Sequence, residues 1–377
     1  MKLLYCLPSL TACGGTERVL TTRLNYLAEN TDYTIYIVVT ESQHSAPYFP
    51  LDPRVKVIEL NIDFLQDRRF TDKFFNYHRR LRQYRRKLTQ VIEEIKPDIV
   101  TSFLSHEIDF MTRLKDGSIK VGENHFNRNF RYSFVKNNTF NPIHRCVALY
   151  RNFRLGRLAG KLDALVSLTE DDSNAWIGRM RKVVIPNPLS FSSSDKSDCL
   201  NQCMMTAGRL TREKGYDMLL KAWDMIASEH PLWRLDIYGE GDEREHLQSM
   251  IDKGIKNVTI HPFEKNIASR FLQSAAFVMS SRFEGFGLVL IEAMECGLPV
   301  ISFDCPSGPR EIITDGKDGI LVKEADITGL AAAMKQLMSD QQLRTEMGKN
   351  AVRKAENYTV ANIMGKWTDL YEGLTRR

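Results

Sequence analysis

Short apolar segments of strand length alternate with longer helical segments along most of the chain. In the first half the strand-like segments are residues 2–7, 33–40, 55–60, 99–103, 120–123 and 164–168, and in the second half they are residues 203–207, 233–238, 258–261, 276–280 and 299–303. Strands that alternate with helices form parallel sheets covered by helices on both faces. A turn-rich stretch, residues 185–197, separates the two sets. The pattern therefore predicts an α/β protein with two doubly wound parallel sheets.

The length supports this division, because 377 residues exceed what one hydrophobic core normally serves. No apolar run approaches the roughly 18 to 20 residues that a transmembrane helix needs, so we expect no membrane span. The net charge of +5 is unevenly distributed. Residues 1–194 hold 29 Lys+Arg against 20 Asp+Glu, whereas residues 195–377 hold 23 against 27. An anionic partner is therefore expected on the first half.

Two segments of the first half carry its positive charge. Residues 68–87 contain nine Lys+Arg and one acid in an amphipathic helical pattern, and residues 124–162 contain no acid but many arginines and aromatics. Such segments suit a membrane surface and a pyrophosphate-bearing acceptor. The alternative that these segments form an ordinary solvated surface remains open. Single-stranded nucleic acid would also suit such segments, but no recognised nucleic-acid motif supports it as a partner. The residues that we expect to contact the membrane surface or the pyrophosphate-bearing acceptor are Arg79, Arg82, Arg86, Arg128 and Arg131.

The cysteines indicate a reducing compartment. Seven cysteines without a C-x-x-C pair favour neither a disulfide framework nor a zinc site. Leu10 to Cys13 imitate a lipoprotein cleavage box, but the apolar segment before them is short for a signal peptide and contains Pro8. We therefore expect a cytoplasmic protein with no metal and no cofactor.

Residues 281–300, SRFEGFGLVLIEAMECGLPV, place two carboxylates, Glu284 and Glu292, eight positions apart across a glycine-rich turn. Gly285 and Gly287 let the backbone bend and approach a ligand closely. The helix that follows presents unpaired amides and a positive dipole end, which suit a phosphate. The alternative is that one glutamate stabilises its own helix and the other is solvated.

Three further stretches place chemically useful residues after predicted strands. Residues 207–215, AGRLTREKG, bring Arg209 and Lys214 to the first strand of the second set, and a Gly14-Gly15 pair follows the first strand of the chain. Glu123, Asn124 and His125 follow the strand at 120–123. Ligands of doubly wound sheets bind beyond the carboxyl ends of the strands. These residues are therefore candidates for a binding site.

Together, the E-G-F-G stretch with its second glutamate, residues 207–215 and residues 302–313 resemble the family 4 retaining glycosyltransferases of GT-B fold. The resemblance is close over residues 200–360 and in the first half is limited to the glycine loop and the strand pattern. It implies two Rossmann-like domains facing a cleft: an acceptor-binding domain at 1–190 and a nucleotide-sugar-binding domain at 198–358. It also implies that the last helix, 359–377, packs back on the first domain.

The resemblance also implies an activity. A hexose or N-acetylhexosamine would pass with retention from a nucleotide-sugar, expected to be a UDP-sugar, to a lipid-linked or polysaccharide acceptor. The work would be cell-surface polysaccharide or lipopolysaccharide biosynthesis, at the inner membrane surface and without nucleic acid. A UDP-sugar epimerase of GT-B architecture and a nonenzymatic membrane-surface adaptor are the alternatives.

Roles for single residues come from the same resemblance. Glu284 and His125 would lie at the reacting sugar, although the Glu-Asn-His order leaves the register open by one residue, to Asn124. Because the chain contains no D-x-D, we expect a metal-independent enzyme in which Arg209 and Lys214 neutralise the diphosphate. The residues expected to bind the donor are Gly15, Arg209, Lys214, Phe286, Gly287, Leu288 and Glu292.

Overall fold

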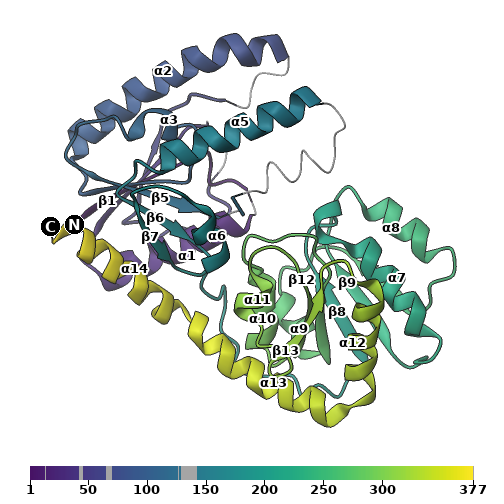
Figure 1. Ribbon diagram of the computed structural model, residues 1–377. Helices are drawn as coiled ribbons and strands as arrows, with labels where there is room; N and C mark the ends of the chain where they lie inside the picture. The colour runs from purple at the N-terminus through teal and green to yellow at the C-terminus, as the bar shows by residue number, and fades with distance from the viewer. Residues whose placement is uncertain (13, 42–45, 65–69, 126, 129–141, 377) are drawn as a thin grey trace. The chain divides into compact units, whose positions relative to one another are not determined.

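The computed structural model describes residues 1–12, 14–41, 46–64, 70–125, 127–128 and 142–376. The chain divides into two compact units (Figure 1). The first unit is Met1–Pro188 with Val360–Arg377, and the second is Leu189–Thr359. The division after Pro188 lies two residues before the boundary that the sequence predicts, and the final helix is part of the first unit.

The first unit contains a seven-stranded sheet and the helices around it. Its strands are β1 (Lys2–Leu7), β2 (Thr34–Val39), β3 (Lys56–Glu59), β4 (Ile99–Ser102), β5 (Ile119–Asn124), β6 (Ala164–Ser167) and β7 (Arg181–Val184). Its helices are α1 (Gly15–Asn30), α2 (Phe70–Ile95), α3 (Ile108–Met111), α5 (Pro142–Ala159), α6 (Glu170–Ala175) and α14 (Val360–Thr375).

The second unit contains a six-stranded sheet. Its strands are β8 (Cys203–Ala207), β9 (Arg234–Tyr238), β10 (Val258–His261), β11 (Ala276–Met279), β12 (Val300–Asp304) and β13 (Gly319–Lys323). Its α-helices are α7 (Tyr216–Ala227), α8 (Arg244–Ile251), α9 (Ile267–Leu272), α10 (Leu288–Glu295), α11 (Pro309–Ile312), α12 (Ile327–Ser339) and α13 (Gln341–Ala355). The short 3-10 turns η1 (Arg212–Lys214) and η2 (Glu356–Tyr358) complete it.

The order of the strands fixes where each sheet can bind a ligand. The first sheet runs β3-β2-β1-β4-β5-β6-β7 and the second β10-β9-β8-β11-β12-β13, and the strand pairs are parallel. The direction in which the chain adds strands reverses between β1 and β4 in the first sheet, and between β8 and β11 in the second. Loops that leave the carboxyl ends of the strands at such a point diverge and leave room for a ligand.

Burial explains why the strands read as apolar runs. The last five residues of β1 are buried, as expected for a central parallel strand covered on both faces. Tyr84 and Leu88 of α2 and Trp176 pack in the first core. Trp223 of α7 and Phe303 of β12 pack in the second. Each unit therefore has a core of its own.

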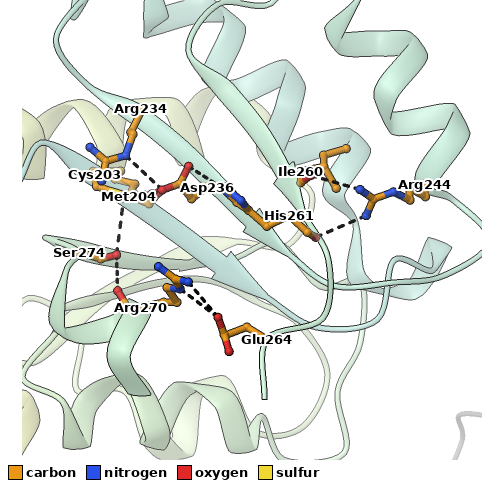
Figure 2. A network of polar contacts seen from close by, with 10 residues as sticks. All are labelled: Cys203, Met204, Arg234, Asp236, Arg244, Ile260, His261, Glu264, Arg270 and Ser274. Atoms are coloured by element: carbon orange, nitrogen blue, oxygen red, sulfur yellow. Dashed lines mark hydrogen bonds and ion pairs between the residues drawn. The ribbon is translucent and has the colours of Figure 1, made fainter. Parts of the chain in front are cut away.

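A polar network braces one side of the second sheet (Figure 2). Asp236 of β9 accepts hydrogen bonds from Cys203 Sγ of β8 at 3.2 Å and from Arg234 Nε at 3.2 Å, and its other oxygen lies 3.1 Å from His261 Nε2 of β10. Arg244 donates to the carbonyl oxygen of His261 at 3.4 Å. Because burial, followed by the nearby Asp236 carboxylate, raises the pKa of Cys203 to about 12, this thiol is a structural donor.

The fold class predicted from the sequence is confirmed, since both units are doubly wound parallel α/β structures. Helix α2 also confirms the amphipathic helix expected over residues 68–87 from Phe70 onward, while residues 68 and 69 lie outside the described residues. Strand β7 was not predicted. Its sequence, RKVV, is short and half polar, which is typical of an edge strand. Among the described helices, none has the length and hydrophobicity needed to span a membrane.

Candidate functional site

The loops at the switch point of the second sheet bring a cation and a carboxylate together. Lys214 follows β8, Glu284 follows β11, and Lys214 Nζ lies 2.7 Å from Glu284 Oε1. Ser281 Oγ donates to the same oxygen at 2.6 Å. The Lys214 side chain is 22% exposed and that of Glu284 is 10% exposed, so the pair is largely buried but remains in contact with solvent. Two residues that the sequence singled out separately thus form one pair.

Glycines allow these loops to approach each other. Gly215 has φ 66°, and a Cβ at this position would lie 2.0 Å from the carbonyl oxygen of Ser280. Gly287 has φ 94° and forms the N-cap of α10. Both residues use the left-handed region that favours glycine. The loop after β8 therefore contacts the loop after β11 directly, and in the first turn of α10 the Leu290 amide donates to the Gly287 carbonyl oxygen at 2.8 Å.

A second ion pair braces the same two loops. Arg282 donates from both terminal nitrogens to the two oxygens of Asp217, each at 2.8 Å. The Arg282 amide also donates to the carbonyl oxygen of Glu213 at 2.8 Å. Burial opposes the charge on Asp217, but hydrogen bonds from Arg282 outweigh it and lower the pKa of this carboxyl. Sequence reasoning missed this pair because Arg282 and Asp217 are 65 positions apart.

Arg209 differs from Lys214 in its surroundings. Its side chain is exposed, and within the described part of the chain no carboxylate lies in salt-bridge range of its guanidinium. An exposed, uncompensated guanidinium offers a bidentate fork to a phosphate. Arg209 is therefore available to an anion, whereas Lys214 already has a partner.

Glu292 has partners distinct from those of Glu284. It lies in the second turn of α10, is buried, and forms a hydrogen bond with the Ser190 hydroxyl. Phe286 is also buried and its ring meets Tyr358 edge-on at 5.7 Å. The structure therefore sets Glu284 beside Lys214 and Glu292 beside Ser190.

Lys214 and Glu284 line a small pocket. Sequence reasoning did not select several of its residues, because threonine, tyrosine and serine carry no distinctive spacing. Burial raises the pKa of Tyr216 well above its ordinary value. The residues that line the pocket are Thr206, Ala207, Lys214, Tyr216, Met279, Ser280, Ser281, Glu284 and Val289.

In the first unit, the switch point lies between the loops that follow β1 and β4. Gly15 begins α1, and a Cβ there would meet no atom within 4 Å. A Cβ at Gly14 would instead lie 2.3 Å from Glu17 Oε2, so a carboxylate of α1 lies close to the start of its own helix. Ser102, at the end of β4, is buried and donates to Glu107 Oε1 at 2.5 Å. Of these residues, Gly15 keeps open space for a ligand.

His125 belongs to a buried charged assembly. Its Nε2 lies 2.7 Å from Glu123 Oε1, and its ring stacks on Phe103 with the centroids 5.2 Å apart. The Glu123 carboxylate also accepts both ends of the Arg23 guanidinium, at 2.9 and 2.7 Å. Burial would raise the pKa of Glu123, but the charge of Arg23, together with the hydrogen bond from His125, lowers it to about 2.

Arg23 is the residue of this assembly that the sequence concealed. An arginine in a helix is usually solvated, and the apolar positions around it gave no sign of a partner 100 positions away. Asn124, the residue before His125, donates to Asp172 Oδ2 at 2.6 Å. Asn124 and His125 therefore have separate partners.

The basic residues of the first unit fall into two groups. Arg79, Arg82 and Arg86 are exposed on α2, opposite the buried Tyr84 and Leu88. Arg128 is partly buried, with its guanidinium 5.0 Å from the Trp176 ring centroid, and burial lowers its pKa. Arg131 lies outside the described residues, as does Cys13.

Helix α5 exposes apolar side chains beside its own arginines. Ile143, Tyr150 and Phe153 are each more than 60% exposed. Arg154 and Arg157 follow on the same helix, and Arg154 also pairs with Asp109 of α3 at 2.9 Å. The sequence indicated the charge of this segment, but only the structure indicates that its apolar residues are uncovered.

The described residues contain no cluster of three or more His, Cys, Asp or Glu side chains with the arrangement of a metal site.

Comparison with known proteins gives consistent likenesses. Residues 201–354 match the family described as Glycosyl transferases group 1. The amylovoran biosynthesis glycosyltransferase AmsD of Erwinia amylovora is 27% identical over 98% of this chain and 99% of its own length. A glycosyltransferase of Haemophilus influenzae is 24% identical over 97% of this chain and 98% of its own length.

Among solved structures, HepE of Anabaena in complex with UDP matches 99% of this chain and 100% of its own, with a TM-score of 0.75 and 19% identity. At this identity the structural likeness shows the fold, which is GT-B.

Proposed function

We propose that this chain, a glycosyltransferase of GT-B fold whose residues 201–354 form a Glycosyl transferases group 1 domain, moves a hexose or N-acetylhexosamine from a UDP-sugar to a growing cell-surface glycan. The observation that carries the proposal is the Lys214 and Glu284 pair at the switch point of the second sheet, on whose first loop the exposed Arg209 also lies. A diphosphate needs cations, and sugar hydroxyls need a carboxylate. This site offers both within one pair of loops.

The nucleotide and the product class are supported by similar proteins. The HepE structure contains UDP, and AmsD acts in amylovoran biosynthesis. We therefore assign the donor to the second unit and a lipid-linked or polysaccharide acceptor to the first.

The transfer exchanges one bond for another at the anomeric carbon. The bond between sugar C1 and the diphosphate oxygen breaks, a bond from C1 to the acceptor hydroxyl oxygen forms on the same face, and the hydroxyl proton passes to the departing diphosphate. Arg209 and Lys214 stabilise the charge that develops on that diphosphate, with the positive dipole end of α10 adding to the effect. No metal enters this scheme.

Glu284 has a specific task in it. Lys214 Nζ forms an ion pair with Glu284. When the diphosphate draws Lys214 toward itself, the Glu284 carboxylate becomes free to accept hydrogen bonds from the donor sugar. Glu292, on α10, would bind the ribose hydroxyls.

One incubation separates this activity from its alternatives. A panel of nucleotide-sugars is mixed with the protein and a polyprenyl-pyrophosphate glycan, and the products are resolved by chromatography. A transferase releases nucleoside diphosphate and extends the glycan. Interconversion of the donor sugars would mean an epimerase, and an unchanged panel would leave only the adaptor.

The acceptor proposal extends to the inner membrane surface. Arg79, Arg82 and Arg86 face outward from α2, and anionic lipid attracts each nearby Lys or Arg by about 1 kcal/mol. The uncovered Tyr150 and Phe153 of α5 suit the interfacial region, where amphipathic aromatic rings are favoured. These features support peripheral binding.

Vesicle cosedimentation tests the membrane proposal. Wild type should bind anionic vesicles at low salt and be released as salt rises, since the Debye length shortens. Five charge reversals on α2 should abolish binding: Arg79→Glu, Arg80→Glu, Arg82→Glu, Arg85→Glu and Arg86→Glu. Leu232→Ser serves as control. Leu232 is an exposed apolar side chain like Tyr150 and Phe153, but it lies in the second unit. Equal partitioning of wild type and the α2 variant would refute the proposal.

A further inference from the structure

The first unit contains an ion pair that is shielded from solvent. The pair links a helix to a strand and is separate from the backbone hydrogen bonds that join the strands. Arg23 of α1 and Glu123 of β5 are buried, with side chains 1% exposed each. Burying two charges costs solvation energy, and apolar residues of similar volume often serve stability as well or better. Such a pair is therefore weak evidence for a stability role.

The pair has an unusual cover on one side. The Arg23 guanidinium lies 3.9 Å from the ring centroid of Trp367, a residue of the last helix, α14. Next to it the hydroxyls of Tyr5 and Tyr371 are 2.8 Å apart. Figure 1 shows α14 lying along α1. The final helix of the chain thus encloses Arg23 and keeps its fork directed at Glu123.

On the other side the pair holds His125. Oxygen Oε1 of Glu123 meets both Arg23 at 2.9 Å and His125 Nε2 at 2.7 Å. Because the pKa of Glu123 is held at about 2, this group is a carboxylate and accepts hydrogen bonds only. The hydrogen of a neutral His125 ring must therefore reside on Nε2.

We infer that Arg23 and Glu123 are positioning residues that fix the tautomer and the orientation of His125, with α14 as the lid of the assembly. The inference rests on the proposed glycosyl transfer and on the place at the reacting sugar that the resemblance implies for His125. Stacking on Phe103 and the bond to Glu123 leave the ring one orientation, in which Nδ1 carries the lone pair. Within the described residues Nδ1 has no hydrogen-bond partner. It is thus the atom that accepts a hydrogen bond from a sugar hydroxyl.

The chemistry of histidine makes such control useful. A neutral imidazole offers one donor and one acceptor, and the wrong tautomer would direct an N–H at an incoming hydroxyl proton. A fixed carboxylate on one nitrogen removes this alternative. The same logic orients the histidine of hydrolytic triads by a buried carboxylate.

The test measures the tautomer directly and activity separately. Nitrogen-15 chemical shifts of the histidine rings distinguish the two neutral forms, and loss of one signal set in His125→Gln assigns it. At alkaline pH the wild type should show hydrogen on Nε2. Replacing the pair by apolar residues, Arg23→Met with Glu123→Leu, should leave the thermal melt intact and give a mixture of tautomers. The same double variant should lose about 10-fold in kcat while KM for the donor is unchanged, because one hydrogen bond to the reacting sugar is lost.

A matched control and one lid variant complete the design. Lys120 and Asp116 form a buried ion pair at the opposite end of β5, 2.6 Å apart, so Asp116→Asn should affect stability without altering the His125 signals. Trp367→Ala should mix the tautomers, whereas Trp367→Phe, which keeps an aromatic face over Arg23, should restore the wild-type spectrum.

The outcomes separate the two claims. If the folded double variant keeps hydrogen on Nε2, Arg23 and Glu123 do not position His125 and the inference fails, whatever the activity. If the tautomers mix while kcat stays at the wild-type value, the positioning holds and the proposed role of His125 at the sugar is wrong.

Discussion

Replacing Arg209 by alanine perturbs the proposed donor site with little effect on the fold, because this side chain is exposed and takes part in no salt bridge with a described residue. Two unit charges 4 Å apart interact by about 1 kcal/mol in water and about 4 kcal/mol at an effective dielectric constant of 20. An exposed guanidinium meeting a diphosphate lies between these limits. A charge-assisted hydrogen bond of this kind contributes about 1.5 to 3 kcal/mol, so Arg209→Ala should weaken UDP binding about 10- to 150-fold.

Titration calorimetry with UDP measures this loss in wild type and variant. Arg212→Ala is the matched control, since it removes a second exposed arginine from the same loop, one to which the resemblance gives no role in binding the diphosphate. The loss at Arg209 should shrink as salt rises, because the contact lies near the surface. Equal UDP affinity of Arg209→Ala and wild type, with unchanged melting, would refute the assignment of Arg209 to the diphosphate.

Three other predictions follow from the same structure. Glu292→Ala should lose most donor-dependent activity with the fold kept, and turnover close to wild type in a variant with normal melting would reject the ribose assignment. Excess chelator should leave the rate unchanged, since Arg209 and Lys214 supply the positive charge; a strict manganese or magnesium requirement would contradict this. The pKa of Glu123 lies at about 2, below its ordinary 4.5, so the Arg23 pair stabilises the fold above that ordinary value and loses its effect as pH falls toward 2. The melting temperature of wild type should therefore fall more steeply than that of the apolar double variant as the pH falls through this range, and equal falls in the two proteins would disprove it.

The sequence was sufficient for the fold because burial and periodicity coincide in this chain. Central strands such as β1 are apolar along their length, and α2 carries its buried residues at helical spacing. Strand β7 was not predicted, because an edge strand of four residues needs no apolar run. Its place is set by pairing with β6, which is a tertiary contact.

The candidate site was predictable where motif and topology agree. Lys214 and Glu284 lie 70 positions apart, yet each follows a strand at the switch point, so their contact follows from the strand order. The partner of Arg23 could not be found in this way. Packing between elements distant in sequence decides which face of α1 lies over β5. The same packing brings α14 over Arg23.

The anomeric configuration of the product tests the central claim most directly. A UDP-sugar with an α linkage is incubated with the protein and its glycan acceptor, and proton NMR follows the anomeric signals together with free UDP. We predict an α-linked extended glycan and one UDP released for each bond formed. A β-linked product, or UDP release without a new glycosidic bond, would contradict retaining sugar transfer by this chain.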